Sequence, residues 1–154
     1  MPIPPDPFPE ALERRKARWE SYGDYRYLRL TDDFRGYPKG TLAWQGHIIP
    51  GYPRIGRIFR LEQGLAQQFA GPFWMEEKID GFNVRIFCSD GEMLALSRGG
   101  YVCPFATDRV PDFLPPTLFE AHPDLVLCAE LAGPDNPYTQ GGPSFVREDV
   151  RLFV

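Results

Sequence analysis

Apolar and polar side chains alternate most regularly between residues 82 and 88, which is the pattern of a half-buried β-strand. Phe82, Val84, Ile86 and Cys88 are predicted to share one face, and Asn83, Arg85 and Phe87 the other. The turn-forming triplet at 89–91, Ser-Asp-Gly, follows, and residues 92–97 supply a return strand. The pattern therefore predicts a β-hairpin over residues 82–97.

Further strand signals flank this hairpin. We expect strands over residues 73–79, 125–131 and 150–154, strand and loop over 22–40, and short strand pieces over 41–60. Only two helices are predicted, one beginning near Pro9 and a short one over 61–69. Successive strands joined by turns, with few long helices, predict an α+β fold built on antiparallel sheet.

The first predicted helix carries a basic run. Phe8, Leu12, Arg15 and Trp19 are expected on one helical face. Residues 14–18, with the sequence RRKAR, are interpreted as a solvated helix face, and a nucleic-acid contact is the alternative.

Composition narrows the class of protein. The length of 154 residues suits one domain with a real core. The net charge of −4 excludes a strongly basic nucleic-acid-binding tail but not a local basic groove. No apolar run approaches the ~20 residues of a membrane span, and residues 1–9 do not form a signal peptide.

Cysteine and histidine usage points to a reduced compartment and to no metal site. Cys88, Cys103 and Cys128 are odd in number and lack CxxC spacing, so free thiols and a cytoplasmic location are expected. The two histidines, His47 and His122, are far apart in sequence, and we predict no metal-ligating residues.

The segment most suited to chemistry is 77–85, with the sequence EKIDGFNVR. Lys78 at a strand end is a candidate amine nucleophile if burial or neighbouring cations lower its pKa. Asp80 is expected to orient that amine by a hydrogen bond, and Gly81 to let backbone approach a ligand closely. Asn83 and Arg85 share a face that suits phosphate or sugar. The alternative is a surface strand held by salt bridges.

This segment contains Lys-x-Asp-Gly and resembles the nucleotide-accepting motif of covalent nucleotidyltransferases, most closely that of ATP-dependent RNA ligases of the archaeal circularising type. Other segments resemble that family in the same order: GYPRIGRIF at 51–59, SRGG at 97–100, ELAGPDNPY at 130–138 and VRLFV at 150–154. Coincidence of several motifs in order makes the resemblance specific. It covers roughly residues 46–154.

The resemblance implies a role for each matching residue. Lys78, with Asp80, would be catalytic, attacking the α-phosphate of ATP to release pyrophosphate and hold AMP as a phosphoramidate. Arg98 and Glu130 would hold the ribose, Phe153 would stack on adenine, and the backbone of Glu77 would read the adenine edge. Asn83 and Arg85 would face the phosphates or the RNA 5′-phosphate. From the residues alone, Arg98 also suits loop closure, Phe153 suits a core position, and residues 136–138 suit a structural turn.

The implied fold is a ligase-type, antiparallel-sheet nucleotidyltransferase domain that is incomplete at its C-terminus. Residues 1–45 would form an N-terminal lead and helix, and 46–154 the N-terminal part of an adenylyltransferase domain. The resemblance implies that the later family motifs, Glu-Gly-x-x and Lys-x-Lys, which hold metal and neutralise phosphates, would lie beyond Val154. The resemblance implies no oligomeric state for these residues.

The implied function is an ATP-dependent RNA ligase, or part of one, that seals RNA 5′-phosphate to 3′-hydroxyl ends with ATP and Mg²⁺ or Mn²⁺ as cofactors. RNA with those ends and ATP are the expected partners, and no membrane is expected. Activity of this chain by itself stays open. Two alternatives remain: a non-catalytic nucleotide- or RNA-binding remnant, and a nucleotidyltransferase of DNA-ligase type. In many DNA ligases an arginine lies five positions after the lysine. Asn83 stands there in this chain and Arg85 follows two later, which favours the RNA branch.

Overall fold

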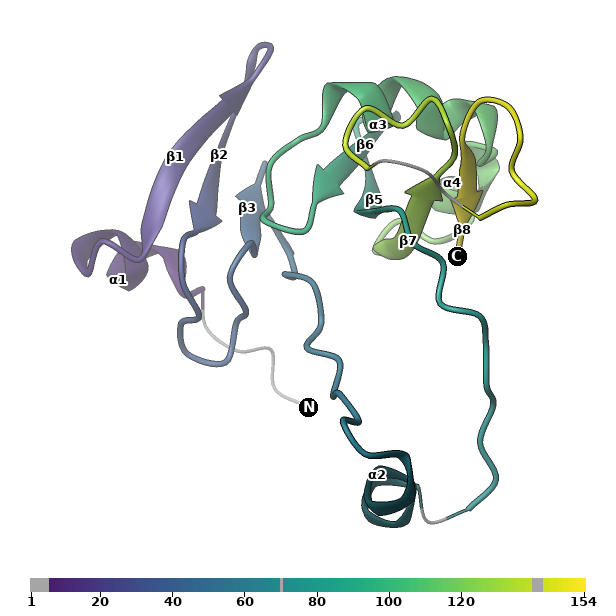
Figure 1. Ribbon diagram of the computed structural model, residues 1–154. Coiled ribbons are helices and arrows are strands. Elements are labelled where there is room, and N and C mark those ends of the chain that lie inside the picture. Colours follow the sequence, from purple (N-terminus) through teal and green to yellow (C-terminus); the bar gives the residue numbers. More distant parts are fainter. Residues whose placement is uncertain (1–5, 70, 140–142) are drawn as a thin grey trace.

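Two four-stranded sheets form the framework of the protein (Figure 1). The structure is a computed structural model that describes residues 6–69, 71–139 and 143–154. The first sheet has the order β1-β2-β3-β4, with β1 at Ala17–Tyr22, β2 at Tyr25–Leu30, β3 at Leu42–Trp44 and β4 at His47–Ile49. The second has the order β6-β5-β7-β8, with β5 at Phe82–Ser89, β6 at Glu92–Ser97, β7 at Leu127–Ala132 and β8 at Arg151–Phe153.

All strand pairings in both sheets are antiparallel, which confirms the α+β fold class predicted from the sequence. The helices are short: α1 at Phe8–Glu13, α2 at Leu61–Gln68, α3 at Pro104–Arg109, the 3₁₀ helix η1 at Val110–Asp112, and α4 at Thr117–Ala121. None of the described helices is long and apolar enough to cross a lipid bilayer.

Strand β5 divides the core between its two faces, as its alternating pattern predicts. Val84 and Ile86 pack with the helix residues Ala106, Val110 and Phe119 on one side of the second sheet. Phe87 on the opposite side packs into a cluster with residues of the first sheet. The second sheet therefore lies between a helical layer and the first sheet.

The β5–β6 hairpin also forms as predicted. Asp90 and Gly91 both have positive φ, 51° and 81°, and Ser89 pairs with Glu92 across the turn. Two consecutive positive φ values define the two-residue turn that matches the natural twist of paired strands.

The first helix is shorter than the sequence predicts, and this is a correction. Helix α1 ends at Glu13, and Trp19, which was expected on its apolar face, lies in β1. Arg15 takes φ 58°, and the N–H of Lys16 donates to the carbonyl of Ala11. This is the hydrogen-bond pattern that closes helices with a left-handed residue. The basic run consequently spans a helix end and a strand instead of one helical face.

Residues 73–79 were predicted to form a strand, and this prediction is wrong. They belong to an arm, residues 53–69 and 71–80, in which α2 is the sole regular element among the described residues. Figure 1 shows the arm leaving after β4 and returning to β5, with α2 at its far end. Its described residues have no neighbouring strand to pair with, and large apolar side chains such as Phe59 and Trp74 are 90% and 94% exposed.

The predicted division between residues 45 and 46 falls in the turn joining β3 to β4. Gln45 and Gly46 have positive φ there, 45° and 83°, and the two strands pair directly. The division into a lead and a domain stays a prediction.

Candidate nucleotide-binding site

Three predicted site residues form a row across neighbouring strands of the second sheet. Asn83 on β5 lies opposite Glu130 on β7, and Glu130 lies opposite Phe153 on β8. Directly opposed residues of antiparallel strands point to the same face. The sheet register therefore brings together side chains that are as many as 70 positions apart in the sequence (153 − 83).

The carboxylate of Glu130 is held from two sides. The backbone N–H of Gly81 donates to Oε1 at 3.0 Å, and Nδ2 of Asn83 donates to Oε2. Both donors are neutral, and no cationic side chain of the described residues forms a salt bridge with Glu130. The carboxylate is thus oriented but keeps lone pairs and negative charge for a further donor, such as a sugar hydroxyl.

Gly81 is required for this arrangement. A Cβ at position 81 would lie 2.6 Å from the carbonyl oxygen of Leu131 and 2.7 Å from Cβ of Ala132. The sequence predicts close approach of Gly81 to a ligand, whereas in the structure the close approach is to β7. This contact fixes the point at which the arm joins the site.

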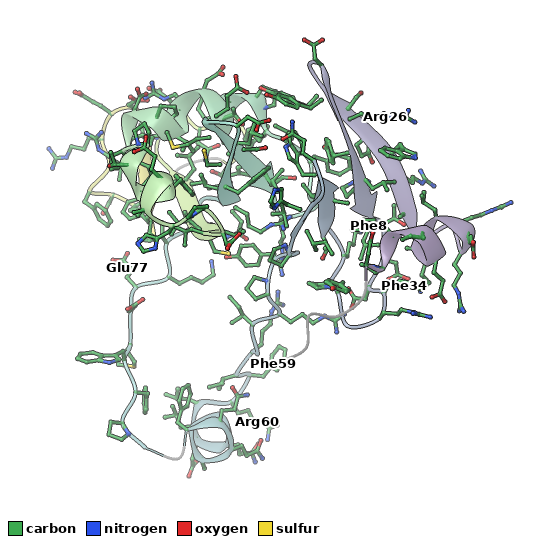
Figure 2. The ribbon with its side chains drawn as sticks, turned by 180° about the vertical axis from the view of Figure 1, so that it is seen from behind. Phe8, Arg26, Phe34, Phe59, Arg60 and Glu77 are labelled. Carbon is green, nitrogen blue, oxygen red and sulfur yellow. The ribbon has the colours of Figure 1, made fainter. Side chains whose placement is uncertain are left out.

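The candidate nucleophile lies just before that point. Glu77, Lys78 and Asp80 are exposed at the end of the arm that returns to β5. Figure 2 shows Glu77 on this returning limb and Phe59 and Arg60 on the outgoing limb. Lys78 and Asp80 make no hydrogen bond to one another within the part of the chain described, so the expected orientation of the amine by Asp80 is not present here.

Arg85 lies deeper than the other predicted residues and is 1% exposed. Its Nη2 donates to the carbonyl of Gly40 at 2.9 Å and its Nη1 to that of Pro50, while Nε is buried without a partner. Burial lowers the pKa of Arg85 to about 10. The thiol of Cys128, opposite in register, has its pKa raised by burial and stays neutral. Arg85 thus links β5 to loops flanking the first sheet.

Arg98 occupies a tight turn after β6. The N–H of Gly100 donates to the carbonyl of Ser97 at 2.9 Å, and Gly100 has φ 81°. A Cβ on Gly100 would lie 2.5 Å from the carbonyl oxygen of Gly40, so this turn packs directly against the first sheet. The side chain of Arg98 is exposed, with its guanidinium 5.6 Å from the ring centroid of Tyr52.

Phe153 ends the row. Its half-buried ring meets Phe145 edge-on at a centroid distance of 5.9 Å. A pocket of about 440 Å³ lies beside it, lined by Phe145, Val146, Arg147, Glu148, Arg151, Leu152 and Phe153. Phe153 therefore lines a pocket at the end of the row and is half-buried.

The segment after Glu130 forms a structural turn, as residues 136–138 suggested. Asn136 is buried, its Nδ2 donates to the carbonyl of Leu131 at 2.6 Å, and its Oδ1 accepts from the N–H of Tyr138 at 2.9 Å. Tyr138 stacks on Phe82 at 4.5 Å. These contacts tie the end of β7 to the start of β5.

Sequence reasoning missed two residues that help build the site, Arg29 and Tyr52. Arg29 is buried on β2 and donates to Glu20 at 2.7 Å and to the hydroxyl of Tyr101 at 2.6 Å, which anchors the turn of Arg98. Tyr52 lies beside Asn83, with its hydroxyl oxygen 3.5 Å from Nδ2. An arginine in a sequence predicted to form strand gives no sign of burial, and Tyr52 stands in a loop between Pro50 and Pro53.

No metal-binding group is formed by the residues that the structure covers. Among residues 6–69, 71–139 and 143–154, no three His, Cys, Asp or Glu side chains come together in a way that would hold an ion. The groups at the site are instead a carboxylate that accepts two hydrogen bonds, an amide, an exposed guanidinium and aromatic rings. This set suits a nucleoside better than a cation.

The comparison with known protein families decides the relationship. A family model described as RNA ligase matches residues 71–154, more than half of the chain. The chain belongs to the RNA ligase family. Lys78, Asn83, Arg98, Glu130 and Phe153 all fall inside the matched region of this RNA ligase family member.

Two individual proteins are similar to this RNA ligase family member over most of its chain. An uncharacterized protein of Methanocaldococcus jannaschii is 34% identical over 147 residues, which are 94% of this chain and 36% of the relative. A structure titled as a putative ATP-dependent DNA ligase from Aquifex aeolicus is 53% identical, with a TM-score of 0.88 over 95% of this chain and 40% of that one.

Two structures of an archaeal ATP-dependent RNA ligase, form 1 and form 2, are 32% and 33% identical, with TM-scores of 0.79 and 0.76. The matches include 93% and 94% of this chain and 40% of each ligase chain. The chain therefore spans about two fifths of the length of these relatives, and the fold is of the ligase type.

Proposed function

We propose that this chain supplies the nucleophile and the nucleoside-binding face of an ATP-dependent RNA ligase. One observation carries the proposal. Glu130 is oriented by Gly81 and Asn83, in register with Phe153, and lies next to the strand entry that follows Lys78. A nucleoside seated on this row presents its α-phosphate toward the lysine.

The first covalent step joins AMP to Lys78. The neutral amine of Lys78 attacks the α-phosphorus of ATP, a P–N bond forms, the bond to the β-phosphate oxygen breaks, and pyrophosphate leaves. The proton of the amine goes to solvent. An oxygen of the RNA 5′-phosphate then attacks the phosphorus of the AMP on Lys78, a P–O bond forms, the P–N bond breaks, and the released amine takes up a proton. The 3′-hydroxyl of the second end attacks that activated 5′-phosphate, a phosphodiester bond forms, and AMP leaves while the hydroxyl proton goes to solvent.

The remaining residues bind and orient. Glu130 accepts from the ribose hydroxyls, and Arg98 donates to the same sugar. Phe153 stacks on adenine through its π face, and the backbone at Glu77 contacts the base edge. Asn83 offers its amide oxygen to the nucleotide.

Arg85 holds backbone and not phosphate, because its side chain is 1% exposed and each terminal nitrogen donates to a backbone carbonyl. A divalent cation would neutralise phosphate charge in this chemistry, although the described residues offer no group of His, Cys, Asp or Glu side chains that could hold it. We also propose a cytoplasmic location, which fits three free cysteines.

The test is incubation with ATP labelled on the α-phosphate, in the presence of Mg²⁺ or Mn²⁺. We expect acid-labile label on wild-type protein and none on Lys78→Arg, because a guanidinium stays protonated and does not attack. Lys39→Arg is the matched control, since Lys39 is exposed and outside the row. Label on Lys78→Arg at the wild-type rate would remove Lys78 as nucleophile. ATP binding without any label would favour the non-catalytic remnant.

A DNA-joining activity is the second candidate, favoured by the 53% identity to the putative ATP-dependent DNA ligase from Aquifex aeolicus. Adenylylated protein in the full-length form should be given matched strands that differ only in ribose or deoxyribose at the 3′ end, at fixed salt. RNA is distinguished through its 2′-hydroxyl, which donates and accepts. Faster sealing of nicked duplex DNA than of single-stranded RNA would assign the DNA reaction.

A further inference from the structure

Tyr52 lies beside Asn83, at one end of the row formed by Asn83, Glu130 and Phe153, and the sequence assigns it no role although it stands in the 51–59 motif. Its hydroxyl oxygen is 3.5 Å from Nδ2 of Asn83, and its ring lies under the guanidinium of Arg98 at 5.6 Å. The charge of Glu130 is close enough to help raise the pKa of Tyr52, after the larger effects of burial and of Cys128. One side chain therefore contacts both halves of the proposed nucleoside site.

The position of Tyr52 is fixed by the two residues before it. The carbonyl of Pro50 accepts from the buried Arg85, and the N–H of Gly51 donates to the hydroxyl oxygen of Thr41 at 2.9 Å. A Cβ at Gly51 would lie 2.7 Å from the carbonyl oxygen of Lys39. The backbone entering Tyr52 is consequently held against the first sheet, while its side chain reaches the second.

The hydrogen bonds of the Asn83 amide indicate the role of Tyr52. The side-chain amide of Asn83 has two hydrogens, and its Nδ2 lies within hydrogen-bond distance of two acceptors, the Glu130 carboxylate and, at 3.5 Å, the hydroxyl oxygen of Tyr52. Its Oδ1 is then left as an acceptor. Because Tyr52 accepts from Asn83, its own O–H remains free to donate. Hydrogen bonds of this kind are long without substrate and tighten when substrate binds.

We propose that Tyr52 is a positioning residue of the nucleotide site, which orients the amide of Asn83 through its hydroxyl and seats Arg98 on its ring. This rests on the proposed function, because ATP is the ligand it would help to place. The hydroxyl and the ring have separable effects, so two substitutions distinguish them.

The experiment compares Tyr52→Phe, which removes the hydroxyl, with Tyr52→Leu, which also removes the ring. Tyr22→Phe is the matched control, since Tyr22 is half-buried in β1 and packs on the cluster between the sheets. ATP affinity is measured by titration calorimetry, adenylylation rate with labelled ATP, and the Arg98 Nε–H resonance by NMR.

We expect Tyr52→Phe to weaken ATP binding about fivefold, the size of one hydrogen bond. Tyr52→Leu should weaken it about twentyfold because a cation–π contact is also lost. The ring-current shift of the Arg98 resonance should persist in Tyr52→Phe and disappear in Tyr52→Leu, which reports the contact between the ring and the guanidinium. A loss of ATP affinity in Tyr52→Phe with an unchanged Arg98 resonance is the change that a merely structural role would not produce. Tyr22→Phe should leave affinity and resonance unchanged.

Wild-type affinity in both Tyr52 variants, or an unchanged Arg98 resonance in Tyr52→Leu, would overturn the proposal. Wild-type protein that does not bind ATP would overturn it as well. Wild-type protein that binds ATP but never labels Lys78 refutes the ligase chemistry alone, and the affinities still decide the role of Tyr52. If Tyr52→Leu does not fold, Tyr52→Phe and its affinity decide the outcome.

Discussion

Replacing Gly81 by alanine tests whether the contact between the arm and β7 builds the site. The backbone N–H of Gly81 donates to Glu130 at 3.0 Å, and the residue has no room for a side chain. One methyl group at this position would therefore act on the fold and on the carboxylate together.

The magnitude follows from the contacts. The new Cβ would lie 2.6 Å from the carbonyl oxygen of Leu131, and ordinary contact begins at 3.4 Å, so the two segments must separate by 0.8 Å (3.4 − 2.6). Such overpacking costs about 1–3 kcal/mol. Loss of the hydrogen bond to the charged Glu130 adds about 1.5 kcal/mol, the low end for charged groups because Glu130 is half-exposed. We expect the free energy of unfolding to fall by about 2.5–4.5 kcal/mol.

Urea denaturation followed by circular dichroism measures this difference, and ATP titration of the folded variant measures the effect on the site. Gly71→Ala is the control, because a Cβ there meets nothing within 4 Å and its backbone requires no left-handed conformation. Surface changes of that kind stay within about 0.5 kcal/mol of wild type. Equal stability and equal ATP affinity for Gly81→Ala and Gly71→Ala would refute the reasoning.

Three further outcomes are expected. Arg85→Lys should lower the free energy of unfolding by about 1–3 kcal/mol in urea titration, because lysine lacks the planar fork with which two separate nitrogens of Arg85 donate to the carbonyls of Gly40 and Pro50. An unchanged midpoint and slope of the urea unfolding curve would contradict the link between the sheets. Burial raises the pKa of Tyr52 above its ordinary value of 10.0. In the 295 nm absorbance titration, the phenol that is present in wild type and absent from Tyr52→Phe should therefore ionise above pH 10. The free energy of unfolding should fall as pH rises past 10, since the folded state then retains a proton that the unfolded state has lost. If the phenol absent from Tyr52→Phe titrates below pH 10, this hydroxyl is not buried. The exposed rings of the arm should make the chain self-associate with rising concentration in sedimentation velocity, less so in the Phe59→Ser, Trp74→Ser double variant; a wild-type monomer at all concentrations would show that these rings do not drive contact.

Local patterns in the sequence were sufficient where a strand and its turn are neighbours. The alternation over residues 82–88 and the Asp90-Gly91 turn predict the β5–β6 hairpin, because side-chain period and positive φ are local properties. The helix prediction near Pro9 was correct in its start and wrong in its end. Nothing in the local pattern marked Arg15 as the left-handed residue that closes the helix.

Non-local contacts decided the remainder. Residues 73–79 are apolar enough for a strand, but a strand forms only beside a partner, and none of the described residues pairs with them. Arg85 was expected at the phosphates from its strand face, and its face was correct. Its depth was not predictable, because burial depends on how closely the Gly40 and Pro50 loops approach β5.

The sequence by itself determined the chemistry available: a lysine before Asp-x-x-Asn, a turn after Ser97 and a glutamate in an apolar strand. It also determined the antiparallel α+β class and, through motif order, the family. Only the tertiary structure decided that Glu130 is oriented by Gly81 and Asn83, and that Tyr52 joins them. The physical reason is that hydrogen bonds between residues tens of positions apart depend on strand register and loop packing, which arise when the whole chain buries its apolar surface.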